Sequence, residues 1–476
     1  MDISKIVAIT FLVGTLVVGT EAHAQTSTAI PGADDRYKVD IMVVVAHPDD
    51  EAGFTPYLAR AIYDLHKRVA VVFGTHGGSG GNNHGREHGP ALADIREIEA
   101  RKACAKLGIT DVWFLDGKDT ASQNVLNSLA SWGHGANLEK LVGLMRLTRP
   151  EIVMTNLPGI FIGENHGDHQ AAGVLTTEAF DLAGDPVAFP AQVAGDMHRN
   201  EMYLENMQPW QPRKLYYSDD TPDAEKYSIS GPSYSVREVS PSQKKPYWHL
   251  AIEAAMPHLT QFPGEIERVS KLSDAELDKM MNDPHTEWWS EPMRFILAKS
   301  VVPGKATHDI FAHLDEAPIR ETEQRHHGCP NEDSGNAASQ TLPRVELGGP
   351  WLYLREFRHA HGLCTIPVAK APEIGIKTGL TVTVPITVLH DGSKMLEVSV
   401  TPKVPESWKV KSGGGKILLP AENRSNFRVD IDTPVLSGDE LKDVKPQEVV
   451  VEVESDGKKI GEVTLKVQLA AGGLPQ

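Results

Sequence analysis

Cysteine is scarce in this sequence, with 3 residues among 476. That number excludes a small scaffold held together by disulfides, because such folds need many cysteines in a short chain. Cys104 lies in an apolar helical pattern and is expected to fill part of a core. Cys329 and Cys364 lie in loop-like sequence. A disulfide between them, a metal-binding role and two free thiols all fit that pattern.

Basic residues are outnumbered by acidic ones. The chain has 47 Lys and Arg against 64 Asp and Glu, which gives a formal net charge of -17. Nucleic acids and anionic membrane surfaces attract proteins through clustered Lys and Arg. The charge balance therefore argues against both as partners, and a neutral or cationic ligand fits better.

Long apolar runs are missing beyond the N-terminus. The first run, Ile6–Val18, follows Lys5 and leads to small residues that end at Ala22-His23-Ala24, which is typical of a secretory signal peptide. It is shorter than the roughly 20 residues that a membrane-spanning helix needs. We expect a signal peptide over residues 1–24, cleavage near Ala24, an exported (periplasmic or secreted) protein and no membrane span.

Short apolar segments alternate with helix-like segments in the first third of the chain. The expected strands are Val39–Val45, Val69–Phe73, Val112–Leu115 and Ile152–Thr155, and the helices between them are Thr55–His66, Ala91–Leu107 and Leu138–Leu147. Strands that are apolar throughout are typical of a parallel sheet buried on both faces. The pattern predicts an α/β domain over residues 25–314 with a Rossmann-like, doubly wound, mostly parallel sheet that binds its ligand at the carboxyl ends of the strands.

The last hundred residues alternate apolar and polar positions with a period of two. The expected strands are Leu380–Leu389, Leu396–Thr401, Phe427–Ile431, Val449–Glu454 and Val463–Leu469, and Asp456-Gly457 is a hairpin signal between the last two. These features predict a β-sandwich over residues 371–476, about the size of an immunoglobulin-like module. Residues 315–370 are mostly polar and are expected to be a linker and connecting segment, in which Trp351–Phe357 suggests a strand.

A histidine and three carboxylates directly follow the first expected strand, in the sequence His47-Pro48-Asp49-Asp50-Glu51. One imidazole and one carboxylate can bind a divalent metal ion, and a second carboxylate can then accept or donate protons. An acidic turn in which His47 caps the strand end is the structural alternative. A buried strand has no structural need for this cluster.

A second polar cluster, His166-Gly167-Asp168-His169, follows the fourth expected strand. Alone it is best interpreted as a polar surface loop. In a doubly wound sheet, however, it can return to the same edge as the first cluster. Three metal ligands, His47, Asp50 and His169, would leave one position of a tetrahedral zinc ion open for water, which is the catalytic arrangement.

With these two motifs, the sequence resembles the LmbE/PIG-L family of zinc-dependent de-N-acetylases, whose fold is Rossmann-like. Three further elements support the resemblance: Arg96-x-x-Glu99 before Leu107-Gly108, Arg149–Val153 at the fourth strand, and His258-x-x-Gln261. The resemblance covers about residues 38 to 310. It implies that one Zn²⁺ per chain is bound by His47, Asp50 and His169, and that Asp49 is the general base that activates the attacking water.

The resemblance implies roles for other residues as well. His166, oriented by Asp168, would stabilise the tetrahedral oxyanion or protonate the leaving amine. Arg96 would reach toward the substrate, although an ion-paired helix arginine fits equally well. Glu51 is expected to be a hydrogen-bonding group beside the metal ligands. Glu164-Asn165 stands where some relatives carry an aromatic residue, which is a departure from the family pattern.

The sequence thus predicts an exported zinc-dependent hydrolase that removes the acetyl group of an N-acetylglucosamine-containing substrate and releases acetate. A zinc amidase acting on another N-acyl substrate is a second reading, because the same chemistry serves any amide. A non-catalytic glycan-binding protein is a third, but it predicts loss of the base or the ligands, and both are present. The expected partner is an amino-sugar small molecule or oligosaccharide, and the sequence gives no indication of the oligomeric state.

Overall fold

The computed structural model describes residues 34–470 apart from 159–165, 194–206, 219–230, 284–288, 290, 304–308, 319–341, 364–365, 367–368, 370 and 443. The expected signal peptide, Cys329, Cys364 and Glu164-Asn165 lie outside the described residues. Cys104 is buried, as expected. Within the described residues we find no helix with the length and hydrophobicity that crossing a lipid bilayer requires.

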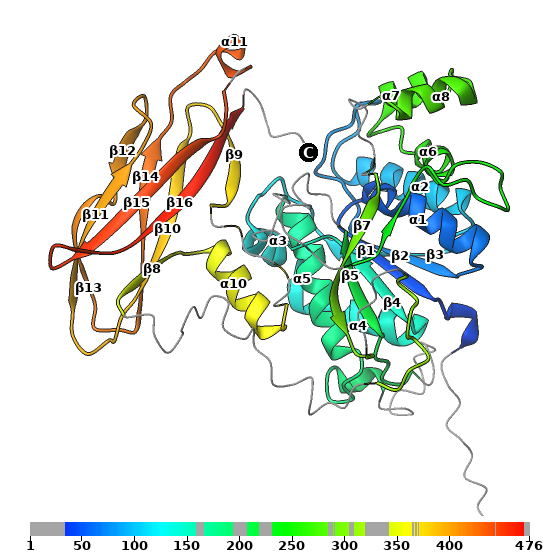
Figure 1. The fold of residues 1–476 in the computed structure, drawn as a ribbon, viewed down its shortest axis with the longest axis horizontal. Helices are drawn as coiled ribbons and strands as arrows, with labels where there is room; N and C mark the ends of the chain where they lie inside the picture. Colours follow the sequence, from blue (N-terminus) through cyan, green and yellow to red (C-terminus); the bar gives the residue numbers. More distant parts are fainter. Residues whose placement is uncertain are drawn as a thin grey trace, which may run out of the picture.

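The N-terminal body is built on a seven-stranded sheet with the order β3-β2-β1-β4-β5-β7-β6 (Figure 1). Its strands are β1 (Ile41–Val45), β2 (Val69–Thr75), β3 (Asp111–Gly117), β4 (Ile152–Thr155), β5 (Lys214–Ser218), β6 (Ser233–Tyr234) and β7 (Met293–Ser300). Strands β1 to β5 are parallel, whereas β7 runs antiparallel to both β5 and β6. The expected mostly parallel, doubly wound sheet is confirmed, and its strand order reverses between β1 and β4.

Helices cover both faces of this sheet, which is why β1, β2 and β4 are buried along their whole length. One face packs against α1 (Thr55–Ala59), α2 (Pro90–Lys106) and α6 (Tyr247–Ala255), and α7 (Pro263–Val269) and α8 (Asp274–Met281) follow on that side. The other face packs against α3 (Val125–Trp132), α4 (His134–Thr148) and α5 (Gly167–Leu182). The crossover expected over Thr55–His66 is shorter as an α-helix and continues as a π-helical turn, Arg60–Asp64.

The C-terminal body is a sandwich of two β-sheets (Figure 1). One sheet has the order β12-β14-β10-β8 and the other β13-β11-β15-β16-β9. The strands are β8 (Arg344–Leu347), β9 (Glu373–Lys377), β10 (Thr381–Leu389), β11 (Leu396–Lys403), β12 (Lys409–Ser412), β13 (Gly415–Leu419), β14 (Arg424–Asp432), β15 (Gln447–Ser455) and β16 (Lys458–Ala470), with a short helix α11 (Gly438–Leu441). Alternate residues of both sheets meet in one apolar core, which confirms the period-two pattern.

The hairpin between β15 and β16 turns at Asp456-Gly457, where both residues have positive φ, 50° and 71°. This is the geometry of a two-residue primed turn. Pairing is antiparallel throughout the two sheets except between β16 and β9, which are parallel.

The segment before the sandwich joins the two bodies. The strand expected over Trp351–Phe357 is wrong, because these residues form the helix α10 (Pro350–Ala360). Trp351, Leu354 and Phe357 recur at every third position and so share one helix face. Leu354 and Phe357 are buried in the apolar core of the N-terminal body. Strand β8, just before α10, pairs instead with β10 of the sandwich.

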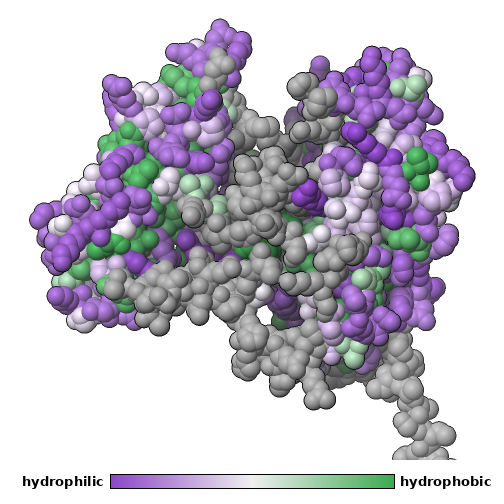
Figure 2. Space-filling model, viewed as in Figure 1, coloured by the Kyte–Doolittle hydropathy of each residue, from purple (hydrophilic) through white to green (hydrophobic). Residues whose placement is uncertain are grey.

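Among the coloured residues on the face shown in Figure 2, polar ones predominate on both bodies. Hydrophobic side chains that stay exposed on the sandwich include Val435, Leu418 and Met395, which are 84%, 59% and 57% exposed. Isolated apolar residues of this kind are ordinary on protein surfaces.

Candidate active site

The two polar motifs meet at the carboxyl edge of the seven-stranded sheet, where the strand order reverses. His47 follows β1 by two residues, and His166 is the N-cap of α5, the helix that follows β4. Ligands of doubly wound sheets bind at this crevice because neighbouring loops diverge there. The topology therefore brings together segments that are 121 residues apart, as the contact between His47 and Asp168 shows.

The loop after β1 has an unusual backbone at Asp49, where φ is 122° and ψ is −25°. A non-glycine residue in this region is strained, and such strain tends to gather at functional sites. The Glu51 carboxylate stabilises the turn by accepting the Asp49 backbone N–H at 2.9 Å. His47 N donates to Asp50 Oδ2 at 2.7 Å, which turns the Asp50 side chain back toward the histidine.

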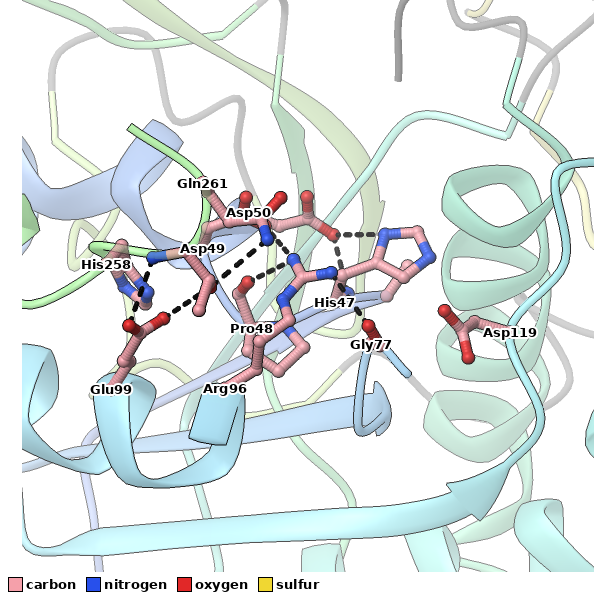
Figure 3. A network of polar contacts seen from close by, with 12 residues as sticks. His47, Pro48, Asp49, Asp50, Gly77, Arg96, Glu99, Asp119, His258 and Gln261 are labelled. Carbon is pink, nitrogen blue, oxygen red and sulfur yellow. Dashed lines mark hydrogen bonds and ion pairs between the residues drawn. The ribbon is translucent and has the colours of Figure 1, made fainter. Parts of the chain in front are cut away.

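Arg96 of α2 is buried and forms hydrogen bonds with this loop (Figure 3). Its guanidinium donates to Pro48 O at 2.6 Å, to Gly77 O at 3.0 Å and to Asp49 Oδ1 at 3.1 Å. Gly77 has φ of 70°, and a Cβ there would lie 2.6 Å from Arg96 Nη1. The arginine thus orients Asp49 and requires glycine at position 77.

Three histidines and one carboxylate converge beside this loop. Ring nitrogens of His47, His166 and His169 lie within 4.8 Å of one another. Asp50 Oδ2 lies 3.3 Å from His47 Nδ1, and Asp50 Oδ1 lies 3.2 Å from His169 Nε2. Imidazole nitrogens together with a carboxylate suit Zn²⁺ and related divalent ions. The described residues therefore fit a divalent metal ion, with the three imidazoles and Asp50 as its candidate ligands.

The charges of the cluster also suit a cation. Burial lowers the pKa of His47, but the charge of Asp50 and the contact with Asp168 outweigh it and raise the pKa to about 9. Burial opposes ionisation of Asp50, yet His169 and His47 hold the pKa of that carboxyl well below its usual range. A protonated histidine thus balances the carboxylate, and a bound metal ion would displace that proton.

Asp168 supports His47 and acts on His166 through Thr120. Its Oδ2 lies 3.2 Å from His47 Nε2. The other ring nitrogen of His47, Nδ1, therefore faces Asp50. This carboxylate–histidine pairing is the one that orients metal ligands. Thr120 N and Oγ1 donate to Asp168 at 2.7 and 3.1 Å, and Thr120 O lies 2.7 Å from His166 Nε2. The sequence analysis predicted that Asp168 orients His166. In the structure Asp168 contacts His47, and Thr120, which the sequence analysis did not name, lies between Asp168 and His166.

Asp49 lies next to the cluster and differs from Asp50 in its environment. Burial raises the pKa of Asp49 to about 6, although Arg96 partly opposes the shift. A carboxylate with a pKa near neutrality is well matched to proton transfer at the pH of most enzymes. The pKa values of the two neighbouring aspartates are therefore shifted in opposite directions. Asp50 stays ionised, whereas Asp49 can exchange a proton near neutral pH.

The segment with the His258-x-x-Gln261 pattern packs against the other side of the motif loop (Figure 3). Thr260 N and Oγ1 donate to the Glu99 carboxylate of α2 at 3.0 and 2.6 Å. Gln261 Nε2 donates to Gly81 O at 3.0 Å. These two hydrogen bonds satisfy the Glu99 carboxylate, which is buried in α2.

Asp119 is a site residue that the sequence analysis missed. It follows β3, it is nearly buried, and it lies across His47 from Glu99 and His258 in Figure 3. One of its oxygens, Oδ2, accepts the Ser79 N–H at 2.8 Å. Its position could have identified it, because Asp119, like His47, stands just beyond the carboxyl end of a parallel strand.

Comparisons with known proteins match the part of the chain that contains both polar motifs. Residues 42–180 match the family model PIG-L, described as GlcNAc-PI de-N-acetylase. The 1D-myo-inositol 2-acetamido-2-deoxy-alpha-D-glucopyranoside deacetylase 1 of Frankia alni is 34% identical over 188 residues, 36% of this chain and 59% of that protein. A deacetylase of the same substrate name from Salinispora arenicola is 31% identical over 173 residues, 32% of this chain and 54% of that protein.

The chain thus spans a little over half the length of these curated relatives. Among solved structures, the N,N'-diacetylchitobiose deacetylase from Pyrococcus horikoshii aligns with 55% of this chain and 85% of that chain, at 18% identity and a TM-score of 0.37. The family match and the motifs that it contains show that residues 42–180 form a domain of the PIG-L (LmbE-like) family.

Proposed function

We propose that this protein is a zinc-dependent hydrolase that removes the acetyl group from an N-acetylglucosamine-containing substrate and releases acetate. The observation that carries the proposal is the convergence of His47, Asp50 and His169 directly beside Asp49, whose pKa is raised to about 6 by burial. The family description and the names of the curated relatives, all deacetylases of acetamido sugars, support the substrate class.

His47, Asp50 and His169 would hold one Zn²⁺ per chain, and Asp168 would keep His47 in the binding tautomer. A zinc ion bound there supplies Lewis acidity, which polarises an amide carbonyl and makes a nearby water more acidic. The protein contributes the geometry: the strained loop at Asp49 and the buried Arg96 hold the carboxylate beside the cluster.

Asp49 is the general base in this proposal. It takes a proton from the water that attacks the acetyl carbonyl carbon, and the carbonyl oxygen gains negative charge. The tetrahedral intermediate collapses when the C–N bond breaks, so the amine nitrogen must gain a proton as it leaves.

In this proposal, His166 donates the proton that the leaving amine nitrogen gains. Its Nε2 lies 2.7 Å from the carbonyl oxygen of Thr120, so Nε2–H donates to that carbonyl and the proton for the amine comes from Nδ1. Burial, together with His47 and His169, lowers the pKa of His166, which makes its protonated ring a strong acid toward the amine. The proton taken up by Asp49 then returns to solvent, His166 takes up a proton from solvent, and acetate and a free amino sugar leave.

The test is acetate release by the purified protein from N-acetylglucosamine, chitooligosaccharides and inositol-linked N-acetylglucosamine. Each is assayed after removal of metal by a chelator and after addition of Zn²⁺. Zinc-dependent release that is absent from Asp49→Asn protein supports the proposal. No release from any of these sugars by protein with zinc bound would overturn the sugar assignment and favour another N-acyl substrate.

A further inference from the structure

We infer that the C-terminal β-sandwich is part of the support of the active site and that it acts through Gln123, a positioning residue. The inference rests on the proposed function for its catalytic consequence. The contact itself is a property of the described structure.

The first observation is the contact between Gln123 and Gly375. Gln123 Nε2 donates to Gly375 O at 2.8 Å, and Gly375 N donates to Gln123 Oε1 at 2.9 Å. Gly375 lies in the middle of β9, the edge strand of its sheet, whose other side pairs with β16. The side-chain amide thus takes the position of one peptide unit of a further strand and satisfies both backbone groups of Gly375.

The second observation is where Gln123 comes from. It lies in the loop between β3 and α3, the segment that also carries Asp119 and Thr120. Thr120 is bonded to Asp168 through its N–H and its hydroxyl, and its carbonyl meets His166. Gln123, which forms two hydrogen bonds with the sandwich, is therefore three positions from Thr120, the residue that links Asp168 to His166.

The third observation is that this loop is tightly joined to the N-terminus of α5. Gly167 N donates to Ser122 O at 2.7 Å, and a Cβ at Gly167 would lie only 2.6 Å from that oxygen. Ser122 N donates to Thr120 Oγ1 at 3.3 Å. A shift of the loop would therefore move the helix end that carries His166 and His169.

Together, these hydrogen bonds and the backbone of the loop form one path from the sandwich to the candidate metal ligands. It runs from Gly375 through Gln123 to the loop, then through Thr120 to Asp168, and from Asp168 to His47. Outer groups that orient metal ligands typically change affinity or activity by about 10- to 100-fold when they are removed. The sandwich thus has a role that differs from that of a spacer or of a module that only binds glycan.

The experiment compares Gln123→Ala with Glu356→Gln in the full chain. Glu356 of α10 pairs with Arg424 of β14 at 3.1 Å on the surface, so its replacement also removes a contact of the sandwich, but one that does not touch the loop. Hydrogen–deuterium exchange is measured on metal-free protein. We expect faster amide exchange over residues 119–124 and 166–170 in Gln123→Ala, and wild-type exchange there in Glu356→Gln.

Kinetics on zinc-loaded protein give the second readout. We expect kcat of Gln123→Ala to fall about ten-fold while KM changes less than about two-fold, because positioning is lost and the sugar contacts remain. Glu356→Gln should keep the wild-type kcat. Wild-type exchange over 166–170, or an unchanged kcat, in Gln123→Ala would overturn the inference. If the wild-type protein deacetylates none of the sugars, the proposed function fails, and the exchange measurement alone decides the inference.

Discussion

His258 and Glu51 form a buried pair in which His258 Nε2 lies 2.6 Å from Glu51 Oε1, with side chains that are 0% and 3% exposed. Burial lowers the pKa of His258, but the charge of Glu51 and the hydrogen bond to it raise the pKa overall. The other oxygen of Glu51 accepts the backbone N–H of Asp49. The pair therefore connects a distant segment to the strained residue that we propose as the base.

We expect His258→Ala to destabilise the protein by about 3 kcal/mol, because the substitution leaves the Glu51 carboxylate buried without its partner. Urea unfolding of His258→Ala, Glu51→Ala and the double variant measures the effect. The double variant should lose clearly less than the sum of the two single variants. Strictly additive losses would show that the two side chains are not coupled.

We expect Asp49→Asn to retain zinc and to lose at least about a hundred-fold in kcat, because an amide cannot accept the proton of water. His169→Ala should lose both zinc and turnover, since it removes a proposed ligand. Metal content by elemental analysis and acetate release are measured on the same samples. A full rate in Asp49→Asn would show that the base is another group.

Zinc binding also tests the assignment of His166. We expect His166→Gln to keep one zinc ion per chain and to lose about 10- to 100-fold in kcat, because His166 is proposed to move a proton and not to bind the metal. Loss of zinc from this variant would place His166, whose ring nitrogens lie near those of His47 and His169, among the ligands.

Gly77→Ala should reduce both stability and activity. The new Cβ would lie 2.6 Å from Arg96 Nη1 at a residue with φ of 70°, a combination that costs about 1 to 3 kcal/mol and displaces the arginine that holds Asp49. Gly264→Ala is the matched control, because nothing lies within 4 Å of a Cβ there. Equal melting temperatures and rates for the two variants would contradict the role of Gly77.

A pH-dependent contribution to stability is expected from His134 of α4, which pairs with Glu178 of α5. The hydrogen bond that His134 donates to the Glu178 carboxylate raises the pKa of His134 above its ordinary value. A histidine whose pKa is higher in the folded state stabilises the protein fully below the unfolded-state pKa, and the effect is lost as the pH rises through the folded-state pKa.

His134→Gln should therefore lower the free energy of unfolding by less than about 1 kcal/mol at about pH 6, since the pair is partly exposed, and by almost nothing at about pH 9. Urea unfolding at the two pH values provides the comparison. A loss that is larger at the higher pH would have the opposite sign and would exclude this ion pair as its origin.

Local patterns in the sequence predict much of this fold because they report burial directly. The strand Ile152–Thr155 has the same bounds in the sequence analysis and in the structure. The strand Val69–Phe73 extends by only two residues in the structure. Proximity of the two polar motifs was also predictable, since the carboxyl ends of parallel strands share one edge of the sheet.

What escaped prediction depends on packing between distant segments. Thr120 has no chemical signature in the sequence, and its importance arises only because Asp168 and His166 lie on either side of it. The side chain of Asp168 reaches His47, a contact between different loops that spacing along the chain cannot fix. Helix α10 was mistaken for a strand because its alternating aromatic and aliphatic residues fit both periods over so few positions.

The path of the chain through β8, α10 and β9 has a practical consequence. Along the chain, β8 belongs to the sandwich, α10 packs against the N-terminal body, and β9 belongs to the sandwich again. No single point of cleavage can release either half intact. A chain cut before residue 344 would expose the apolar surface that Leu354 and Phe357 cover, and one cut after residue 370 would leave β8 without the strand it pairs with. The two halves are therefore expected to melt together and to resist separation by limited proteolysis.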